Sequence, residues 1–201
     1  GCNDFLAITR PDVIEEIHAS FLSVGSEAVE TDTFRSNRLT LTEYGLQDRT
    51  LEINRAAASL ARRVCDRIAT ETGIPRFVAG SIGPSGKLPS GTDPDLSNIT
   101  FDELSDVFYE QAQGLVEGGA DLLLVETSQD ILEVKAAVVG INRYFADAGV
   151  RVPLQVQITL DTSGRMLFGT DIASALTTLE SLPIDIIGMN CSTGPEYMRQ
   201  P

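Results

Sequence analysis

The chain has 201 residues, 42% hydrophobic and 22% charged, which is typical of a globular protein and excludes disordered or collagen-like classes. Its 29 acidic residues outnumber 15 basic ones, and a net charge of −14 argues against a nucleic-acid partner because such a surface repels phosphate groups. No stretch approaches the roughly 18 apolar residues that a membrane span needs, so we expect no membrane partner.

The first predicted element is a helix with Thr9 as its N-cap, Pro11 in its first turn and Gly25 after its end. We expect Ile14, Ile17, Phe21 and Leu22 on its inward face. Further helices are predicted over residues 48–72, 100–117, 131–148 and 171–182, the second of these opened by a capping box of Thr100 and Glu103. Strands are predicted over residues 28–34, 77–82, 122–125, 154–159 and 184–189.

Strands that alternate with helices in this way predict a parallel sheet, either in a (β/α)8 TIM-type barrel or in a doubly wound fold. We favour the barrel because no G-x-G-x-x-G sequence follows a predicted strand. The predicted strands begin about 39 residues apart, so eight of them would need roughly 310 residues. We therefore expect residues 1–201 to form a single, incomplete barrel domain with about five parallel strands and their helices.

The cysteines and the only histidine are sparse. Cys2, Cys65 and Cys191 are too few and too scattered for a disulfide framework, so we expect a reducing compartment, the cytoplasm. Cys65 falls in a predicted helix and is expected to be structural, whereas nothing decides the role of Cys2. His18 is expected at the surface or boundary of the first helix, and a lone histidine excludes a His-rich zinc site within this chain.

Polar residues follow several predicted strands, at the carboxyl ends where α/β folds gather reactive groups. Glu126 comes directly after the apolar run 122–125, where a carboxylate needs a cation or hydrogen-bond donors. It forms a salt bridge or caps the next helix, or else it receives a substrate ammonium group. Cys191, after the last strand, is either a small buried residue or an exposed thiolate that acts as nucleophile or metal ligand.

Motifs at these strand ends resemble the homocysteine S-methyltransferase family, and within it the homocysteine-binding domains of cobalamin-dependent methionine synthases. Residues 30–34 (E-T-D-T-F) are similar to the E-T-N-T-F of that family. Further matches are Gly83-Pro84, the stretch from residue 117 to Glu126-Thr127, and residues 188–191, which look like the family's G-x-N-C. The resemblance covers nearly the whole chain.

The resemblance implies a TIM-type barrel that holds zinc by three thiolates, one of them from Cys191. It further implies that Glu126 binds the ammonium group of homocysteine and that Thr33, Ser81 and Asn190 line the pocket. In such proteins the zinc-activated homocysteine thiolate accepts a methyl group from methylcobalamin, with methyltetrahydrofolate as the ultimate donor, and gives methionine. Cobalamin and folate would bind to other modules of the parent protein.

Two features of that family have no counterpart in residues 1–201: the opening strand and an adjacent pair of cysteines. The resemblance therefore implies that the segment carries one of three zinc ligands and is inactive on its own. A betaine- or S-methylmethionine-dependent homocysteine methyltransferase is the alternative within the family. A non-catalytic scaffold, an incomplete barrel that a partner completes, is the alternative from another class.

Overall fold

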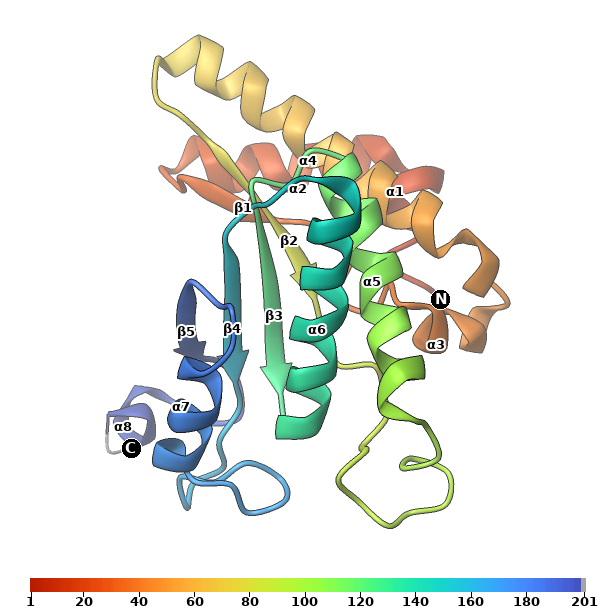
Figure 1. The fold of residues 1–201 in the computed structure, drawn as a ribbon. Coiled ribbons are helices and arrows are strands. Elements are labelled where there is room, and N and C mark those ends of the chain that lie inside the picture. The colour runs from red at the N-terminus through yellow and green to blue at the C-terminus, as the bar shows by residue number, and fades with distance from the viewer. Residues whose placement is uncertain (200–201) are drawn as a thin grey trace. The chain divides into compact units, whose positions relative to one another are not determined.

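The computed structural model describes residues 1–199 (Figure 1). Its strands are β1 Ala28–Glu30, β2 Phe77–Ile82, β3 Leu122–Ser128, β4 Leu154–Ile158 and β5 Ile186–Met189. Its helices are α1 Leu6–Thr9, α2 Pro11–Ser23, α3 Arg38–Leu41, α4 Thr50–Thr72, α5 Phe101–Glu117, α6 Ile131–Ala148, α7 Ile172–Glu180 and α8 Pro195–Met198, with two short 3₁₀ turns, η1 Thr42–Tyr44 and η2 Gln47–Arg49.

The five strands form one sheet in the order β1-β2-β3-β4-β5, which is also their order along the chain. The outer pairs, β1 with β2 and β4 with β5, are parallel. Each crossover between successive strands contains a helix, as expected for right-handed β–α–β connections. The predicted alternation of strands and helices is confirmed.

The described residues divide into two compact units, one formed by residues 1–82 and 110–123 and the other by residues 83–109 and 124–199. In the first unit the long helix α4 packs on α1, α2 and β2. Four apolar residues of α4, Ile53, Leu60, Val64 and Ile68, are all buried. The helix ends at Gly73, whose left-handed backbone (φ 72°) lets its N–H bond back to the last turn.

The prediction for the first helix was partly wrong. Thr9 is not an N-cap, because it ends the additional short helix α1, and Arg10 stands at the N-cap position of α2. Of the four residues predicted to face inward, Ile14 and Leu22 are buried, but the other two are not. Ile17 and Phe21 are 45% and 58% exposed, whereas His18, expected at the surface or boundary, is 5% exposed.

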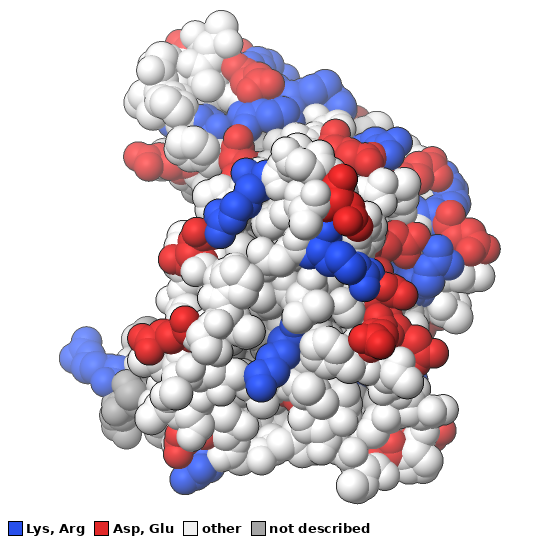
Figure 2. Space-filling view, viewed as in Figure 1, with Lys and Arg blue, Asp and Glu red and all other residues white. Residues whose placement is uncertain are grey.

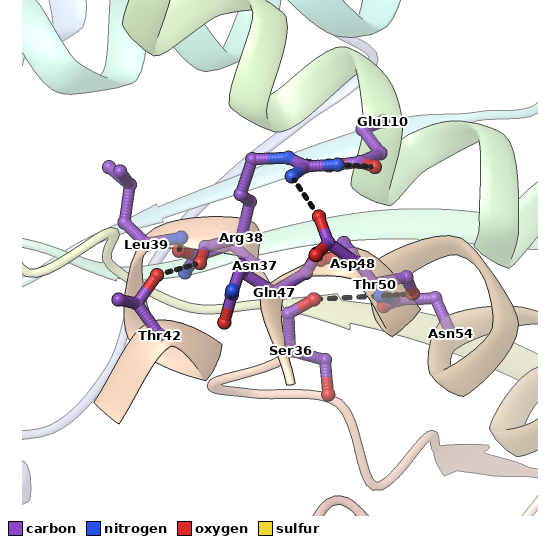
Figure 3. A network of polar contacts seen from close by, with 10 residues as sticks. All are labelled: Ser36, Asn37, Arg38, Leu39, Thr42, Gln47, Asp48, Thr50, Asn54 and Glu110. Carbon is purple, nitrogen blue, oxygen red and sulfur yellow. Dashed lines mark hydrogen bonds and ion pairs between the residues drawn. The ribbon is translucent and has the colours of Figure 1, made fainter. Parts of the chain in front are cut away.

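Side-chain hydrogen bonds fix the segment that follows β1 in the first unit (Figure 3). Arg38 donates to both carboxylate oxygens of Glu110, at 3.0 and 2.8 Å, and to Asp48 at 3.2 Å. Asn37 caps α3 by accepting from two backbone N–H groups of its first turn. Asn54, buried in α4, donates to two backbone carbonyls, one of which belongs to this segment. Strand β1, which precedes this segment, is shorter than predicted and ends at residue 30.

In the second unit, the first part of α5 (residues 101–109) packs closely against α6 at a glycine. A Cβ atom on Gly140 would collide with the carbonyl oxygen of Ser105 and approach the backbone N of Tyr109 to 3.1 Å. The ring of Tyr109 also packs edge-on against Tyr144, and the guanidinium carbon of Arg143 lies 5.0 Å from the centroid of the Tyr109 ring. Gly140 is therefore required by the close approach of the two helix backbones.

Acidic and basic side chains are interspersed over the face in Figure 2, so the net negative charge does not gather there in one acidic patch. Many of them are paired, as in the ion pair of Arg62 with Asp121 at 2.6 Å. Within residues 1–199, none of the helices combines the length and the apolar character that crossing a membrane requires.

Candidate functional site

The strand ends of the first unit hold two of the predicted site residues, Thr33 and Ser81. The Thr33 hydroxyl donates to the Ser81 carbonyl at 2.7 Å, and the Ser81 N–H donates to the Thr31 hydroxyl at 3.0 Å. The two threonine hydroxyls are 2.6 Å apart, and because Thr33 has given its proton to Ser81, Thr31 is the donor between them. Gln111 donates to the Thr33 carbonyl at 3.0 Å. Thr33 and Ser81 thus lie together in a buried hydrogen-bonded cluster.

A hollow of about 730 Å³ lies beside this strand end, lined mainly by apolar side chains of α2 and β1. Asp32 borders it, and burial together with the nearby Asp4 carboxylate raises the pKa of Asp32 to about 6. His18 borders it too; its Nε2 is buried and has no hydrogen-bond partner, and burial lowers the pKa of the imidazole. The sequence did not indicate that Asp32 and His18 border the same hollow.

The strand ends of the second unit bring together the other three predicted residues, Glu126, Asn190 and Cys191. The Asn190 amide nitrogen lies 3.2 Å from Glu126 Oε2 and 3.5 Å from Cys191 Sγ. Thr127 completes the group, with its N–H donating to Asn190 Oδ1 at 2.9 Å and its hydroxyl accepting from Asn190 Nδ2 at 2.9 Å. A carboxylate and an exposed thiol are therefore joined through one amide.

The backbone holds this group in place. Asn190 donates its N–H to the carbonyl of Ile158, the last residue of β4, at 3.2 Å. Its own carbonyl accepts from the Thr159 hydroxyl at 3.0 Å. Because these bonds and the Thr127 bonds use both the main chain and the side chain of Asn190, its amide has a single orientation. We call Glu126, Thr127, Asn190 and Cys191 the strand-end cluster.

Of the interpretations open for Glu126, one is now excluded. The helix that follows, α6, is capped by Asp130, whose carboxylate accepts from the Leu132 N–H at 2.9 Å. Glu126 is 9% exposed and lies at the end of β3, in contact with the Asn190 amide. The carboxylate is thus positioned by the strand, and helix capping does not explain it.

Two carboxylates at the start of α6 hold the loop of residues 83–98, and neither pairing could be predicted from the sequence. Glu133 accepts from both the N–H and the hydroxyl of Ser85, while Asp130 accepts from both the N–H and the hydroxyl of Ser90. Burial raises the pKa of Glu133 to about 7, although the Ser85 hydrogen bonds act in the opposite direction. Acidic residues are common at the start of a helix. Glu133 and Asp130 differ from such residues only in their serine partners, which lie 40 or more positions away in the sequence.

Among residues 1–199, no three His, Cys, Asp or Glu side chains converge in a way that could hold a metal ion. Cys191 is exposed and Cys65 is buried in the other unit, where its thiol donates to the Phe77 carbonyl at 3.6 Å. Burial raises the pKa of the Cys65 thiol to about 11, which fits the structural role expected of it. The described residues therefore do not by themselves make a zinc site.

Comparison with known proteins identifies the class. The sequence profile of the family described as homocysteine S-methyltransferase matches residues 1–201, and the chain belongs to this methyltransferase family. It is 43% identical over 203 residues to the methionine synthase of Mycobacterium tuberculosis (strain ATCC 25618 / H37Rv) and 42% identical over 200 residues to that of Mycobacterium leprae (strain TN). Each match covers 100% of this chain and 16% of the relative, so the chain spans about one sixth of the length of these proteins.

Solved structures show the same fold. The metallated form of the homocysteine methyltransferase MmuM from Escherichia coli superposes with a TM-score of 0.79 at 19% identity, covering 96% of this chain and 67% of that one. The apo form gives a TM-score of 0.75 at 22% identity, covering 98% and 68%. The predicted fold class is confirmed: the α/β fold is of the TIM-barrel type, with five parallel strands present.

Proposed function

We propose that this chain is part of the homocysteine-binding module of a methionine synthase-type enzyme of the cytoplasm. In this proposal the methyl group comes from methylcobalamin, with methyltetrahydrofolate as ultimate donor, and both cofactors bind to parts of the parent protein outside residues 1–201. Residues 1–201 contribute an incomplete barrel domain that is inactive alone. Support comes from the family membership and from the 42–43% identity to two methionine synthases.

The single observation that carries the proposal is the strand-end cluster. Glu126 presents a nearly buried carboxylate at the carboxyl end of β3, the end at which parallel α/β folds bind their ligands. A buried carboxylate is a strong receptor for an ammonium group, because a charge-assisted hydrogen bond in a dry site contributes about 1.5–3 kcal/mol. Asn190 contacts both Glu126 and Cys191. It would hold the carboxylate so that a thiol amino acid binds with its ammonium group at Glu126 and its thiol toward Cys191.

Thr33 and Ser81 stay in the proposal as pocket-lining residues of lesser weight. The Thr33 side chain is fully buried, and its hydroxyl is engaged both as donor and as acceptor. These bonds suit a residue that shapes the pocket wall through the backbone of the strand ends. We therefore propose that Thr33 and Ser81 act on homocysteine through shape, and that Glu126 and Asn190 contact it.

Zinc remains part of the proposal only for the parent protein. Cys191 would supply one thiolate, and two further thiolates would have to come from outside the described residues, which offer no group of three ligands. The proposal therefore predicts less than one tightly bound zinc per isolated chain. One tightly bound zinc per isolated chain of residues 1–201 would contradict it.

The methyl donor is tested by assaying the full-length parent with methylcobalamin, with betaine and with S-methylmethionine. We expect methionine to form with methylcobalamin and not with the other two donors. Turnover with betaine or S-methylmethionine alone would contradict the cobalamin assignment and leave the homocysteine site intact. No turnover with any donor, together with no binding of homocysteine, would favour the scaffold alternative.

A further inference from the structure

Thr127 has a backbone conformation that its residue type rarely adopts. Its φ is 58°, in the left-handed region, where a β-branched residue is strained. Among residues 1–199, the non-glycine residues with positive φ are Thr127, Cys191 and Ser192. Two of the three thus belong to the strand-end cluster, and the third follows it directly. Surrounding contacts must hold Thr127 in this conformation.

The Asn190 side chain supplies two of those contacts. The left-handed turn points the Thr127 N–H at Asn190 Oδ1, and it places Thr127 Oγ1 where Asn190 Nδ2 can donate to it, both at 2.9 Å. The backbone N–H and the hydroxyl of Thr127 thus pair with the oxygen and the nitrogen of the Asn190 side-chain amide. These two bonds are the shortest side-chain hydrogen bonds that Asn190 makes, so they determine where its amide lies.

The Thr127 hydroxyl then lies between the two chemically reactive groups. It is 3.4 Å from Glu126 Oε2 and 3.6 Å from Cys191 Sγ. Because the hydroxyl accepts from Asn190, it has one proton left to donate, and either neighbour can take it. Thr127 and Asn190 therefore each contact both the carboxylate of Glu126 and the thiol of Cys191.

We propose that Thr127 is a positioning residue that fixes the Glu126 carboxylate relative to Cys191, and so makes the site prefer a thiol that carries an amino group. This inference rests on the proposed function, in which Glu126 receives the ammonium group of homocysteine. Thr127 itself does not contact the substrate in this account. It acts by holding the Asn190 amide, which in turn holds Glu126.

The test compares two thiols in the full-length parent: homocysteine and 4-mercaptobutanoate, the same molecule without its amino group. Two matched pairs of side chains isolate the hydroxyl. Thr127 and Thr127→Val are equally β-branched and exchange the hydroxyl for a methyl group, and Thr127→Ser and Thr127→Ala are equally unbranched and differ by the hydroxyl alone. The measured quantity is the ratio of kcat/KM for homocysteine to kcat/KM for 4-mercaptobutanoate.

We expect Thr127 and Thr127→Ser to keep a high ratio, and Thr127→Val and Thr127→Ala to lower it by about tenfold, the equivalent of one lost polar contact in a specific site. A merely structural role would reduce the amount of folded enzyme and lower both kcat/KM values together, which leaves the ratio unchanged. An unchanged ratio in both Val and Ala variants would overturn the inference.

The failure of the proposed function looks different in the same experiment. If the wild-type parent shows no preference for homocysteine over 4-mercaptobutanoate, then Glu126 is not an ammonium receptor, and both proposals fail. If the wild type prefers homocysteine and the Val and Ala variants keep that preference, only the role of Thr127 fails. Urea unfolding of each variant verifies that the measured rates refer to folded protein.

Discussion

Glu133, in the first turn of α6, accepts two hydrogen bonds from Ser85, one from its backbone N–H at 2.8 Å and one from its hydroxyl. The two residues are 48 positions apart in the sequence. The pair ties the loop after β2 to a helix of the same unit at the carboxyl end of the strands. Because the Glu133 carboxylate is 3% exposed, its ionisation is linked to the stability of this connection.

The pKa of Glu133 makes stability depend on pH. Burial raises it from 4.5 to about 7, so the folded state binds the proton more tightly than the unfolded state. The resulting stability is fully present below pH 4.5 and is lost as the pH rises through 7. The side chain in Glu133→Gln cannot ionise. The free energy of unfolding of this variant should therefore rise by about 3 kcal/mol relative to wild type between pH 4.5 and pH 8, as measured by urea unfolding.

Glu103→Gln is the matched control for that experiment. The pKa of Glu103 is lowered by its hydrogen bonds with Thr100, so its stabilisation is present above pH 4.5 and is lost in acid. Between pH 4.5 and pH 8 the difference between Glu103→Gln and wild type should therefore stay nearly constant, and it should change only in more acidic solution. A stability difference for Glu133→Gln that does not vary from pH 4.5 to pH 8 would refute the assignment.

His18 should make the protein sensitive to acid. Burial lowers its pKa, so the neutral imidazole is the form that the folded state accepts. Its contribution is present above the unfolded pKa of about 6.5 and is lost as the pH falls through the folded value. In His18→Leu the decrease in unfolding free energy between pH 7.5 and pH 5 should be smaller than in wild type. An equal decrease in the two proteins would show that other groups govern acid unfolding.

Asp130 should control the accessibility of the loop of residues 83–98. It caps α6 and accepts two hydrogen bonds from Ser90, so Asp130→Ala removes the cap and both ties. Lys87 is the basic residue within this loop, and tryptic cleavage after it should become at least tenfold faster, as expected for about 1–3 kcal/mol of lost stabilisation.

Ser90→Ala provides the graded comparison, because it removes the hydroxyl tie and keeps both the backbone tie and the cap. Its cleavage rate should lie between those of wild type and Asp130→Ala. If Asp130→Ala is cleaved after Lys87 at the wild-type rate, the loop is held by other contacts.

Gly140→Ala should be strongly destabilising. The added Cβ would meet the Ser105 carbonyl of α5, and neither helix backbone can move without disturbing the packing around it, so we expect a loss of about 2 kcal/mol or more in urea unfolding. Gly194→Ala is the control, since nothing lies within 4 Å of its Cβ position and its φ is −84°. Equal stabilities of the two variants would contradict the close packing of α5 and α6.

Local patterns predicted most of the fold. The capping box of Thr100 with Glu103 is present as expected, and β2 spans the predicted residues 77–82. Periodicity was less reliable for α2, where it correctly indicated a helix and the burial of Ile14 and Leu22 but placed Ile17 and Phe21 inward instead of His18. Apolar residues lie on more than one side of this helix. Tertiary packing therefore decides which side faces the core, and the sequence does not show that packing.

The candidate site was predictable only in part, for a related reason. Glu126, Asn190 and Cys191 stood out because polar residues directly after buried strands are unusual, and the structure brings them together. Thr127 and Glu133 did not stand out. The first depends on a left-handed backbone, and the second on a serine 48 positions away. Neither property is visible in local sequence.

The central claim, that Glu126 receives the ammonium group of homocysteine, is tested most directly by Glu126→Gln in the full-length parent. The isosteric change removes the charge and keeps the contact with Asn190. We predict that it raises the KM for homocysteine about 10- to 100-fold, and that it leaves the KM for 4-mercaptobutanoate unchanged. An unchanged KM for homocysteine, or an equal rise for both thiols, would contradict the account.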